Sequence, residues 1–271
     1  MSLVEGVKYG RYGKACAWPP RPPPDPATVR QITPDELRSW ILYEDDDLFV
    51  LNKPGDVVCH PSKAGPWSSL VGAVREYTGL PTVHLIFRLD RETSGVVVFA
   101  KHAAMASRLQ KALQKRWIGK TYTAILTGEM QEAVTVNQPL GDDLASPVYV
   151  KTTVSKEGSE AISHFTPIAV SQGFTLAKVL TETGRKHQIR AHAQWMGRMM
   201  VGDKIYGPDE RLYLDFIDHG WSDALAEKLL LKRQALHCAE IDLTGAWVDK
   251  VFKAPLTEDL ATFSRNHGLL P

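Results

Sequence analysis

A charged junction between two apolar runs constrains this chain more than any other feature of its sequence. The segment HLIFRLDRETSGVVVFAK, residues 84–101, sets Arg88, Asp90 and Arg91 between runs that predict buried strand. Burying an unpaired carboxylate costs several kcal/mol, so an aspartate at the start of a core strand is normally paired or chemically active. The charge pattern leaves two interpretations open: a structural ion pair at a sheet corner, or a carboxylate kept ionised as a nucleophile or general base.

The composition indicates an ordinary globular protein. Apolar residues make up 44% of the 271 residues and charged residues 23%. No apolar run approaches the roughly 18 residues that span a membrane, and no N-terminal apolar core resembles a signal peptide. We therefore expect no membrane partner and a cytoplasmic location. The cysteines, Cys16, Cys59 and Cys238, form no CxxC pair, which indicates free thiols rather than a disulfide framework or a zinc knuckle.

Charge is distributed unevenly along the chain. The net charge is only +1, which argues against a polycation that coats nucleic acid over its whole surface. Residues 101–120, however, contain six Lys or Arg and no acidic residue, and residues 185–204 contain five against the single acid Asp203. A neutral protein with two basic segments is expected to hold a polyanion on one face.

The N-terminal segment differs in composition from the rest. The stretch WPPRPPPDP, residues 18–26, has six prolines in nine residues and favours extended polyproline II structure. The motif TPDE, residues 33–36, then provides a hydroxyl cap, proline at the first helical position and glutamate three residues after the cap, which predicts a short helix through Ile41. We expect a Pro-rich extension over residues 1–32 and one folded domain over residues 33–271.

Strand and helix patterns alternate irregularly after this point. Strands are expected at 48–55, 95–101, 120–128, 161–170, 174–184 and 235–245, helices at 68–79, 105–115 and 186–196, and an insertion with some helix at 209–234. The absence of strict alternation predicts an α+β fold with a mixed, mostly antiparallel β-sheet and flanking helices. One face of the helix at 105–115 carries three basic residues, Arg108, Lys111 and Lys115.

The motif TGRKHQIRAHAQWMG, residues 183–197, invites a metal-site interpretation that its spacing does not support. His187 and His192 are five residues apart, which places them about 140° apart on a helix rather than on one face. A third ligand with familiar spacing is also missing from the neighbouring sequence. We expect no metal here, and instead a helix on which Lys186 and Arg190 share a face that can meet phosphate or a carboxylate.

Other reaction classes have little support. The sequence contains neither GxxxxGK nor GxGxxG after a strand, so no nucleotide cofactor is expected. Ser94 lies in TSG rather than GxSxG, which does not favour a serine hydrolase. Tyr122 in KTYTAIL, taken by itself, is typical of an ordinary sheet aromatic.

Four segments, in this order, resemble the RluA-type pseudouridine synthases, which convert uridine to pseudouridine in ribosomal or transfer RNA. LYEDDDLFVLNKPGDVVCHPS is similar to the first conserved segment of that family, and FRLDRETSGVVVFAK to its HRLDxxTSG signature. KTYTAILTGE resembles the segment that carries the active-site tyrosine, and GRKHQIRAH followed by VGDKIYG resembles the last signature. The resemblance runs from about Leu42 to Leu256 and implies that residues 33–271 form the pseudouridine synthase catalytic domain.

The resemblance implies roles for individual residues. Asp90 matches the catalytic aspartate, Tyr122 the active-site tyrosine that stacks on uracil, and Arg190 the arginine that pairs with the aspartate. Arg88 is expected to fill the gap that the flipped uridine leaves in the RNA. The remaining residues expected to bind RNA or substrate are Asn52, Lys53, Arg108, Lys111, Lys115, Lys186 and His187.

The implied reaction needs neither metal nor cofactor, because the N1–C1′ bond breaks and the uracil rejoins through C5 without redox change. The aspartate is able to attack C1′, to add to C6 or to abstract a ribose proton, and the sequence does not choose among these routes. The expected partner is structured RNA, either rRNA or tRNA, bound by a monomer.

Two departures and two alternatives accompany this interpretation. Phe87 stands where the family usually has His, and RMMVGD replaces a more usual Pro-containing approach, so local RNA contacts are expected to differ. Only about 40 residues precede the matched region, so an S4-like RNA-binding domain is not expected there. The alternatives are a non-catalytic RNA-binding protein on the same fold and a glycosidase, for which Glu92 is the only second acid near Asp90.

Overall fold

The computed structural model describes residues 29–60 and 64–271. The first helix, α1 (Pro34–Ser39), begins as expected with a capping box in which Thr33 and Glu36 exchange side-chain and backbone hydrogen bonds. It ends at Ser39, earlier than expected, because Ile41 already belongs to strand β1 (Ile41–Glu44). Residues 1–28, which hold most of the expected Pro-rich extension, lie outside the described residues.

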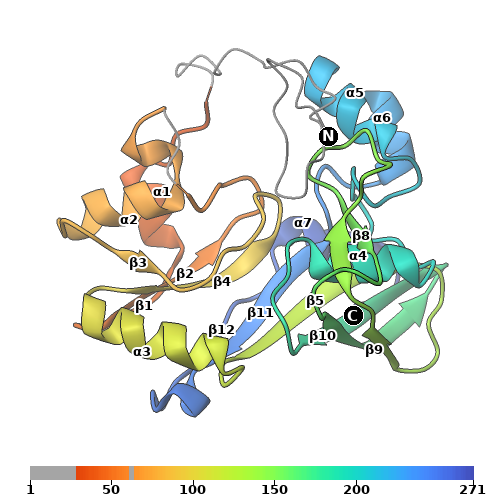
Figure 1. Ribbon diagram of the computed structural model, residues 1–271. Coiled ribbons are helices and arrows are strands. Elements are labelled where there is room, and N and C mark those ends of the chain that lie inside the picture. Colours follow the sequence, from red (N-terminus) through yellow and green to blue (C-terminus); the bar gives the residue numbers. More distant parts are fainter. Residues whose placement is uncertain (1–28, 61–63) are drawn as a thin grey trace, which may run out of the picture.

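A single mixed sheet runs through the molecule in the order β1-β2-β4-β11-β5-β10-β9-β6, with β3 paired to β4 and β12 to β11 (Figure 1). Its strands after β1 are β2 (Leu48–Lys53), β3 (His84–Leu85), β4 (Ser94–Ala100), β5 (Gly119–Thr127), β6 (Val134–Asn137), β9 (Ile162–Ser171), β10 (Phe174–Thr181), β11 (Leu236–Asp242) and β12 (Val251–Lys253). Apart from the parallel pair β4–β11, the described strand pairs of this sheet are antiparallel. This confirms the predicted fold class.

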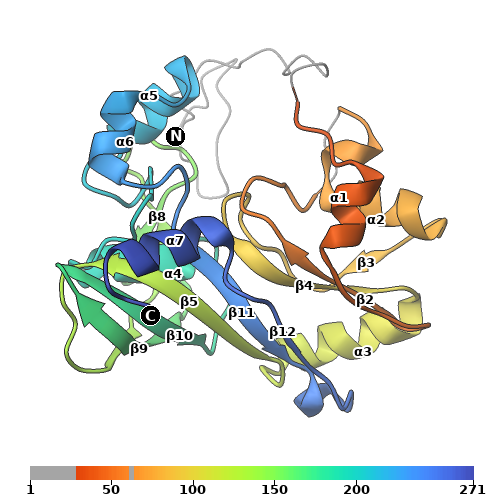
Figure 2. The ribbon, with the colours of Figure 1, turned by 180° about the vertical axis from the view of Figure 1, so that it is seen from behind.

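Two apolar cores lie at the two ends of this sheet (Figures 1 and 2). The first is formed by β2 and β4 with α2 (Leu70–Thr78) and α3 (Ala103–Gln114). The second is formed by β5 and β10 with α4 (Gln188–Trp195) and α7 (Glu258–Asn266). Tyr122 in β5 packs against both cores, so the expected active-site tyrosine lies where the two halves meet.

The helix boundaries follow from local sequence. Ser69 caps α2 through a hydrogen bond from the Gly72 backbone, and Gly79 ends the helix in the left-handed conformation, with φ of 67°. His102 caps α3 by accepting from the Met105 backbone. Gly79 is the stop that the sequence pattern predicts, whereas α3 begins two residues earlier than expected.

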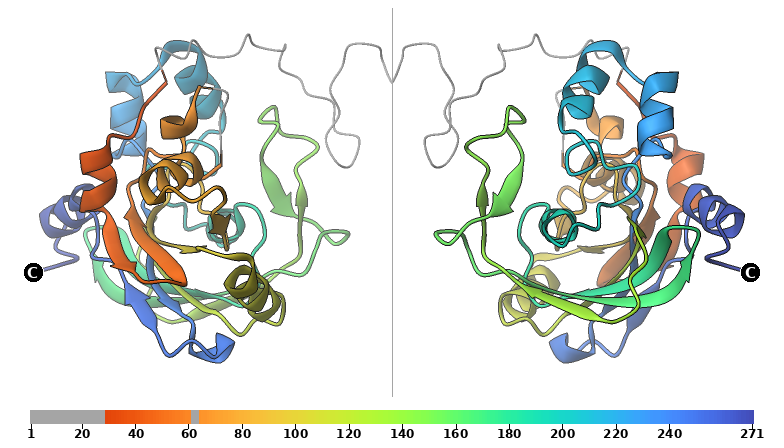
Figure 3. Two further views of the ribbon diagram at one scale, coloured as in Figure 1. Left: turned by 90° about the vertical axis from the view of Figure 1, so that its left-hand side faces the viewer. Right: turned by 90° about the vertical axis from the view of Figure 1, so that its right-hand side faces the viewer.

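Smaller elements stand above the sheet. The hairpin β7 (Leu140–Asp142) and β8 (Thr152–Val154) forms a separate small sheet that stands away from the main one (Figure 3). The expected insertion contains α5 (Arg211–His219) and α6 (Asp223–Leu229), joined by a small apolar cluster. Short 3-10 turns occur at Pro66–Ser68 and Thr244–Ala246. Among the described residues, none of the helices has the length and apolarity needed to cross a membrane.

Candidate active site

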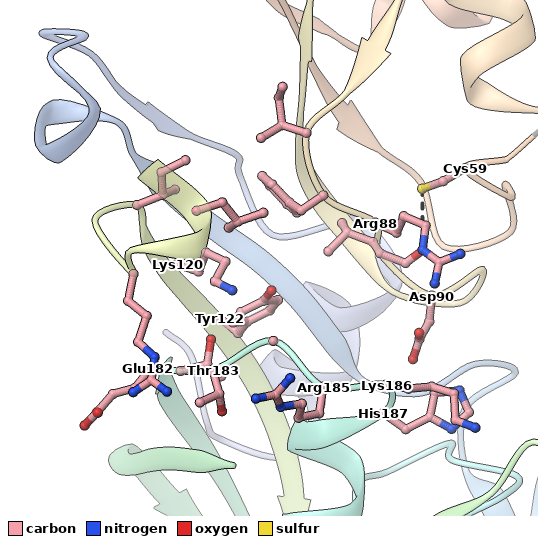
Figure 4. A pocket seen from close by; sticks show the side chains of 18 of the residues that line it. Cys59, Arg88, Asp90, Lys120, Tyr122, Glu182, Thr183, Arg185, Lys186 and His187 are labelled. Carbon is pink, nitrogen blue, oxygen red and sulfur yellow. Dashed lines mark hydrogen bonds between the residues drawn. The ribbon is translucent and has the colours of Figure 1, made fainter. Parts of the chain in front are cut away.

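A cavity of about 850 Å³ opens between the two halves of the sheet (Figure 4). Five segments line it: residues 58–60 after β2, the loop that precedes β4, the end of α3 with the turn after it, the start of β5, and the segment between β10 and α4. Because these segments come from different parts of the sequence, the sheet topology is what brings them together. Its charged lining residues are Arg88, Asp90, Arg91, Arg116, Lys120, Glu182, Arg185 and Lys186.

Asp90 and Arg190, one hundred residues apart in sequence, are in direct contact. Arg190 Nη1 donates to Asp90 Oδ2 at 3.0 Å. The same guanidinium also forms a two-pronged pair with Asp203, from Nε to Oδ2 at 2.6 Å and from Nη2 to Oδ1 at 2.8 Å. Arg190 therefore joins two carboxylates, of which the sequence predicted only Asp90.

Asp203 is the more tightly held of the two carboxylates. It is fully buried, and its Oδ1 also accepts from the backbone N–H groups of Ile205 and Tyr206, both at 3.0 Å. The Tyr206 ring lies beneath the Arg190 guanidinium, 4.9 Å from ring centroid to Cζ. These contacts fix the guanidinium independently of Asp90.

Asp90 is ionised in this environment. Burial by itself raises the pKa of Asp90, but interactions with His187 and Arg190 and hydrogen bonds from Arg190 and Gln234 lower it below its usual value. Burial, followed by the charge of Arg190, lowers the pKa of His187 to about 4, so His187 is neutral at pH 7. The charge that holds Asp90 ionised at neutral pH is therefore that of Arg190.

Only one oxygen of Asp90 is engaged. Oδ2 accepts from Arg190 and, at 3.3 Å, from Gln234 Nε2. Within the described part of the chain, Oδ1 accepts no hydrogen bond, and the Asp90 side chain is 33% exposed in the cavity wall. An ionised carboxylate with one oxygen held and the other open to a cavity is able to act as nucleophile or base.

Tyr122 lies in the same cavity (Figure 4). Burial, together with the neighbouring Cys238 and Asp90, raises the pKa of Tyr122 well above its usual value. The phenol therefore stays protonated and is a poor base, but its ring is available for stacking. Lys120, two residues earlier on the same strand, also lines the cavity. Its ammonium group forms no hydrogen bond and no ion pair with the described residues.

Three of the expected binding residues lie at the cavity. Arg88 is exposed, lines the cavity and is free of ion pairs to the described residues. His187 also lines it and contacts the Tyr206 hydroxyl through Nδ1 at 3.0 Å. Lys186 lies at the cavity and pairs with Asp142 at 3.1 Å. Lys186 precedes α4, so the expectation that it shares a helix face with Arg190 is wrong.

Lys53 requires a correction, whereas an RNA contact by Asn52 remains a prediction. Both lie in β2, and neither lines the cavity. Lys53 is completely buried and donates its three N–H bonds to the backbone oxygens of Pro54, Val57 and Arg91 at 2.8 to 2.9 Å. It has no donor left for RNA and instead ties β2 to the loop that carries Asp90.

The basic residues of α3 lie outside the cavity. Arg108, Lys111 and Lys115 are exposed, but the C-terminal part of α3 contributes Leu113 and Gln114 to the cavity wall instead. Leu113 lies on the side of α3 opposite to Arg108 and Lys111, and Lys115 is the C-cap residue of the helix. An RNA contact by the three basic residues remains a prediction.

Glu92, the only second acid near Asp90 in sequence, is engaged elsewhere. Its carboxylate accepts from Lys204 Nζ at 2.7 Å and from the Gln234 backbone at 3.3 Å, and it does not line the cavity. The glycosidase interpretation, which needs a second carboxylate beside the first, therefore loses its candidate.

Sequence reasoning missed several residues of the site. Asp203 lies in the segment VGDKIYG, which by itself predicts no role for this aspartate. Gln234 lies at the end of the insertion, outside every segment that resembles a family signature. The cavity cations Arg116, Lys120 and Arg185 were also missed, although strand alternation from Tyr122 places Lys120 on the same face.

Comparisons with known proteins agree with this geometry. The family model described as RNA pseudouridylate synthase matches residues 47–195, more than half of the chain. The ribosomal large subunit pseudouridine synthase D of Vibrio vulnificus is 34% identical over 266 residues, which cover 89% of this chain and 79% of that protein. The uncharacterized RNA pseudouridine synthase YhcT of Bacillus subtilis is 31% identical over 245 residues, 87% of this chain and 74% of that protein.

A solved structure shares the fold. Human RNA Pseudouridylate Synthase Domain Containing 4 superposes with a TM-score of 0.67 and 22% identity, over 85% of this chain and 94% of that chain. The family match and the two relatives, taken together with the sequence signatures, show that this chain belongs to the RNA pseudouridine synthase family, in its RluA-type branch.

Proposed function

We propose that this RNA pseudouridine synthase isomerises uridine in the RNA of the large ribosomal subunit, with Asp90 as its catalytic residue. The substrate class comes from relatives named ribosomal large subunit pseudouridine synthase D. The observation that carries the catalytic assignment is the carboxylate of Asp90, whose Oδ2 is held by Arg190 while Oδ1 faces the cavity.

The reaction breaks the N1–C1′ bond of uridine and forms a C5–C1′ bond, after which C5 loses its proton and N1 gains one. Attack on C1′, addition to C6 and abstraction of a ribose proton all require an ionised carboxylate oxygen. Asp90 Oδ1 is the oxygen available for each of them. The cavity of about 850 Å³ is large enough for a nucleotide that has left its stack.

Two neighbours support Asp90 in this proposal. Arg190 keeps the carboxylate ionised and oriented, and it is itself fixed by Asp203. Tyr122 stacks on the uracil, while its protonated phenol is not the base that removes the C5 proton.

RNA is held by the cations of the cavity. Arg88 and Lys120 carry charges that no described residue neutralises, and a phosphodiester is the natural counter-charge for both. His187 and Lys186 complete the cavity rim, and the basic face of α3 provides a second, outer contact. The same proposal divides the chain into a Pro-rich extension of residues 1–32 and a catalytic domain of residues 33–271. It also includes a monomeric state and a cytoplasmic location. A monomer is consistent with Asp90, Tyr122 and Arg190 all coming from one chain.

The test is tritium release from RNA labelled at C5 of uridine, since C5 loses its hydrogen in this reaction. Transcripts of large-subunit rRNA, small-subunit rRNA and tRNA are compared without added metal or nucleotide. Release from large-subunit rRNA is expected, and mapping of pseudouridine in cells with and without the gene should identify the position. Release from tRNA alone would overturn the substrate assignment. Binding without release from any RNA would favour the non-catalytic alternative.

A further inference from the structure

The loop that carries Asp90 is held from behind by the segment that follows α6. Arg233 Nη1 donates to the Glu92 backbone oxygen at 3.0 Å, and the Gln234 backbone N–H donates to Glu92 Oε2 at 3.3 Å. Lys204 Nζ bridges the two segments, because it donates both to Glu92 Oε1 at 2.7 Å and to the backbone oxygen of Lys232 at 2.5 Å. Residues 232–234 and the catalytic loop therefore form one connected unit.

Gln234 reaches through this unit to the reactive carboxylate. Its side-chain amide donates one hydrogen to Thr93 Oγ1 at 2.7 Å and the other to Asp90 Oδ2 at 3.3 Å. The residue is only 1% exposed, so water does not replace these bonds. Both amide hydrogens are used, which fixes the orientation of the amide group.

The backbone on either side of Gln234 is anchored as well. Arg233 forms a two-pronged pair with Asp259 of α7, at 2.6 Å and 3.0 Å. Gln234 also begins the turn into β11, which pairs with both β4 and β5. A side chain with such supports can direct a neighbouring carboxylate, because its own position costs little entropy to maintain.

We propose that Gln234 is a positioning residue for the isomerisation, and that it sets the orientation of the Asp90 carboxylate toward the cavity. With Arg190 and Gln234 both donating to one oxygen, Oδ2, the carboxylate cannot turn out of this orientation without breaking two hydrogen bonds. Oδ1 is thereby kept toward the cavity. The inference rests on the proposed function in that it assumes Asp90 to be the reacting group.

The contact also affects the ionisation of Asp90. The groups that act on this carboxylate are Arg190 and His187 from α4 and the segment before it, Gln234 before β11, the buried Lys53 ammonium from β2, Cys59 from the segment after β2, and Tyr122 from β5. Hydrogen bonds to the ionised form lower a carboxyl pKa, so loss of the Gln234 donor raises the pKa of Asp90. In a plot of rate against pH, the fall in rate on the acidic side, here called the acid limb, should then move to higher pH.

The experiment replaces Gln234 by Met, which has a similar shape but no donor, and by Glu, which brings a like charge against Oδ2. Gln110→Met serves as the control, since Gln110 donates to the Ile86 backbone oxygen and has no contact with Asp90. Single-turnover rate, RNA affinity, pH profile and thermal unfolding are measured for each. For Gln234→Met we expect a rate loss of about tenfold or more, RNA affinity within about twofold and an acid limb at higher pH. The Glu variant should move the acid limb further.

A direct titration separates this inference from the proposed function. The pKa of Asp90 is followed by carbon-13 NMR of labelled aspartate in wild type and in Gln234→Met, without RNA, with Asp90→Asn identifying the signal. The inference requires a higher pKa in the variant, whether or not any RNA proves to be a substrate. A folded Gln234→Met protein with unchanged rate, acid limb and Asp90 pKa would overturn it. Should this variant not fold, Gln234→Glu carries the test, and an unmoved Asp90 pKa in that protein counts against the inference in the same way.

Discussion

Asp90 and Asp203 share the guanidinium of Arg190, yet they have different surroundings. Asp203 is fully buried, with both oxygens engaged by Arg190 and with two backbone N–H groups on Oδ1. Asp90 is 33% exposed, and its Oδ1 faces the cavity. The comparison teaches that Asp203 fixes the arginine in place, and that the arginine in turn holds one oxygen of Asp90 and leaves the other accessible.

This division of roles has an energetic consequence. A buried arginine with one carboxylate partner would be stranded by loss of that partner, at a cost of about 3 to 5 kcal/mol. Arg190 has two partners, so the loss of Asp90 still leaves it paired with Asp203. Stability and activity can therefore be separated at Asp90 but not at Arg190. The predictions that follow are ordered by their expected effect on the free energy of unfolding.

Arg190→Met should have the largest effect. The change leaves the fully buried Asp203 without its charge partner, and we expect a loss of about 3 to 5 kcal/mol in the free energy of unfolding. Turnover should fall much more than RNA affinity in whatever fraction remains folded. Urea unfolding and RNA binding are measured beside Arg75→Met, an exposed arginine of α2 that does not line the cavity and should change stability little. A fully stable Arg190→Met protein would show that Asp203 does not depend on this arginine.

Asp203→Asn should have a smaller but clear effect. The amide places an N–H group against the guanidinium, while Asp90 remains as a partner, so we expect a loss of about 2 to 3 kcal/mol. Activity should fall because Arg190 loses its second support, and part of it should remain. If this variant unfolds no more easily than wild type, the two aspartates do not differ as the geometry indicates.

Lowering the pH should protonate both carboxylates, with loss of activity reporting on Asp90 and loss of stability reporting on Asp203. Arg190 outweighs burial and lowers the pKa of Asp203, and the pKa of Asp90 is lowered as well. A lowered native pKa contributes stability that is present above the unfolded value of about 3.9 and is lost as pH falls through the native value. We therefore expect activity to persist at pH 5 and acid unfolding to begin only below about pH 4. In Asp203→Asn the pH dependence of stability should be shallower, as urea unfolding at a series of pH values will show.

Neutralising Arg108, Lys111 and Lys115 of α3 should have the smallest effect on stability, within about 0.5 kcal/mol, because all three are exposed. RNA affinity should fall, and its log–log salt slope should flatten by about 0.7 to 0.9 per lost phosphate contact. A matched variant of the cavity cation, Lys120→Met, should reduce affinity without touching this face. An unchanged slope in the triple variant would mean that the α3 face is only solvated.

Local patterns predicted the longer central elements of the fold but not the short strands or α7, because caps, glycine stops and strand alternation act within a few residues. The capping box at Thr33 and the stop at Gly79 are examples. Asp90, Tyr122 and Arg190 could be predicted from their resemblance to family signatures, and the structure brings them to one cavity. Those assignments to catalysis remain predictions.

Contacts between residues far apart in the sequence could not be predicted from local patterns. Gln234 meets Asp90 across 144 positions in sequence, and nothing in its own neighbourhood marks it. Lys53 illustrates the opposite error, since its place in a segment that resembles a family motif predicts an RNA contact, whereas the fold buries it against three backbone oxygens. Burial depends on what packs above a strand, which the strand's own sequence does not specify.

Asp90→Asn tests the central claim most directly, because it keeps the size of the side chain but removes the negative charge. The variant is assayed for tritium release from C5-labelled large-subunit rRNA, together with RNA affinity and urea unfolding on the same preparation. The account predicts near-normal stability, since Asp203 still pairs with Arg190, normal RNA binding and no release above background. Substantial release by folded Asp90→Asn protein, or a loss of activity that only follows a loss of stability, would contradict it.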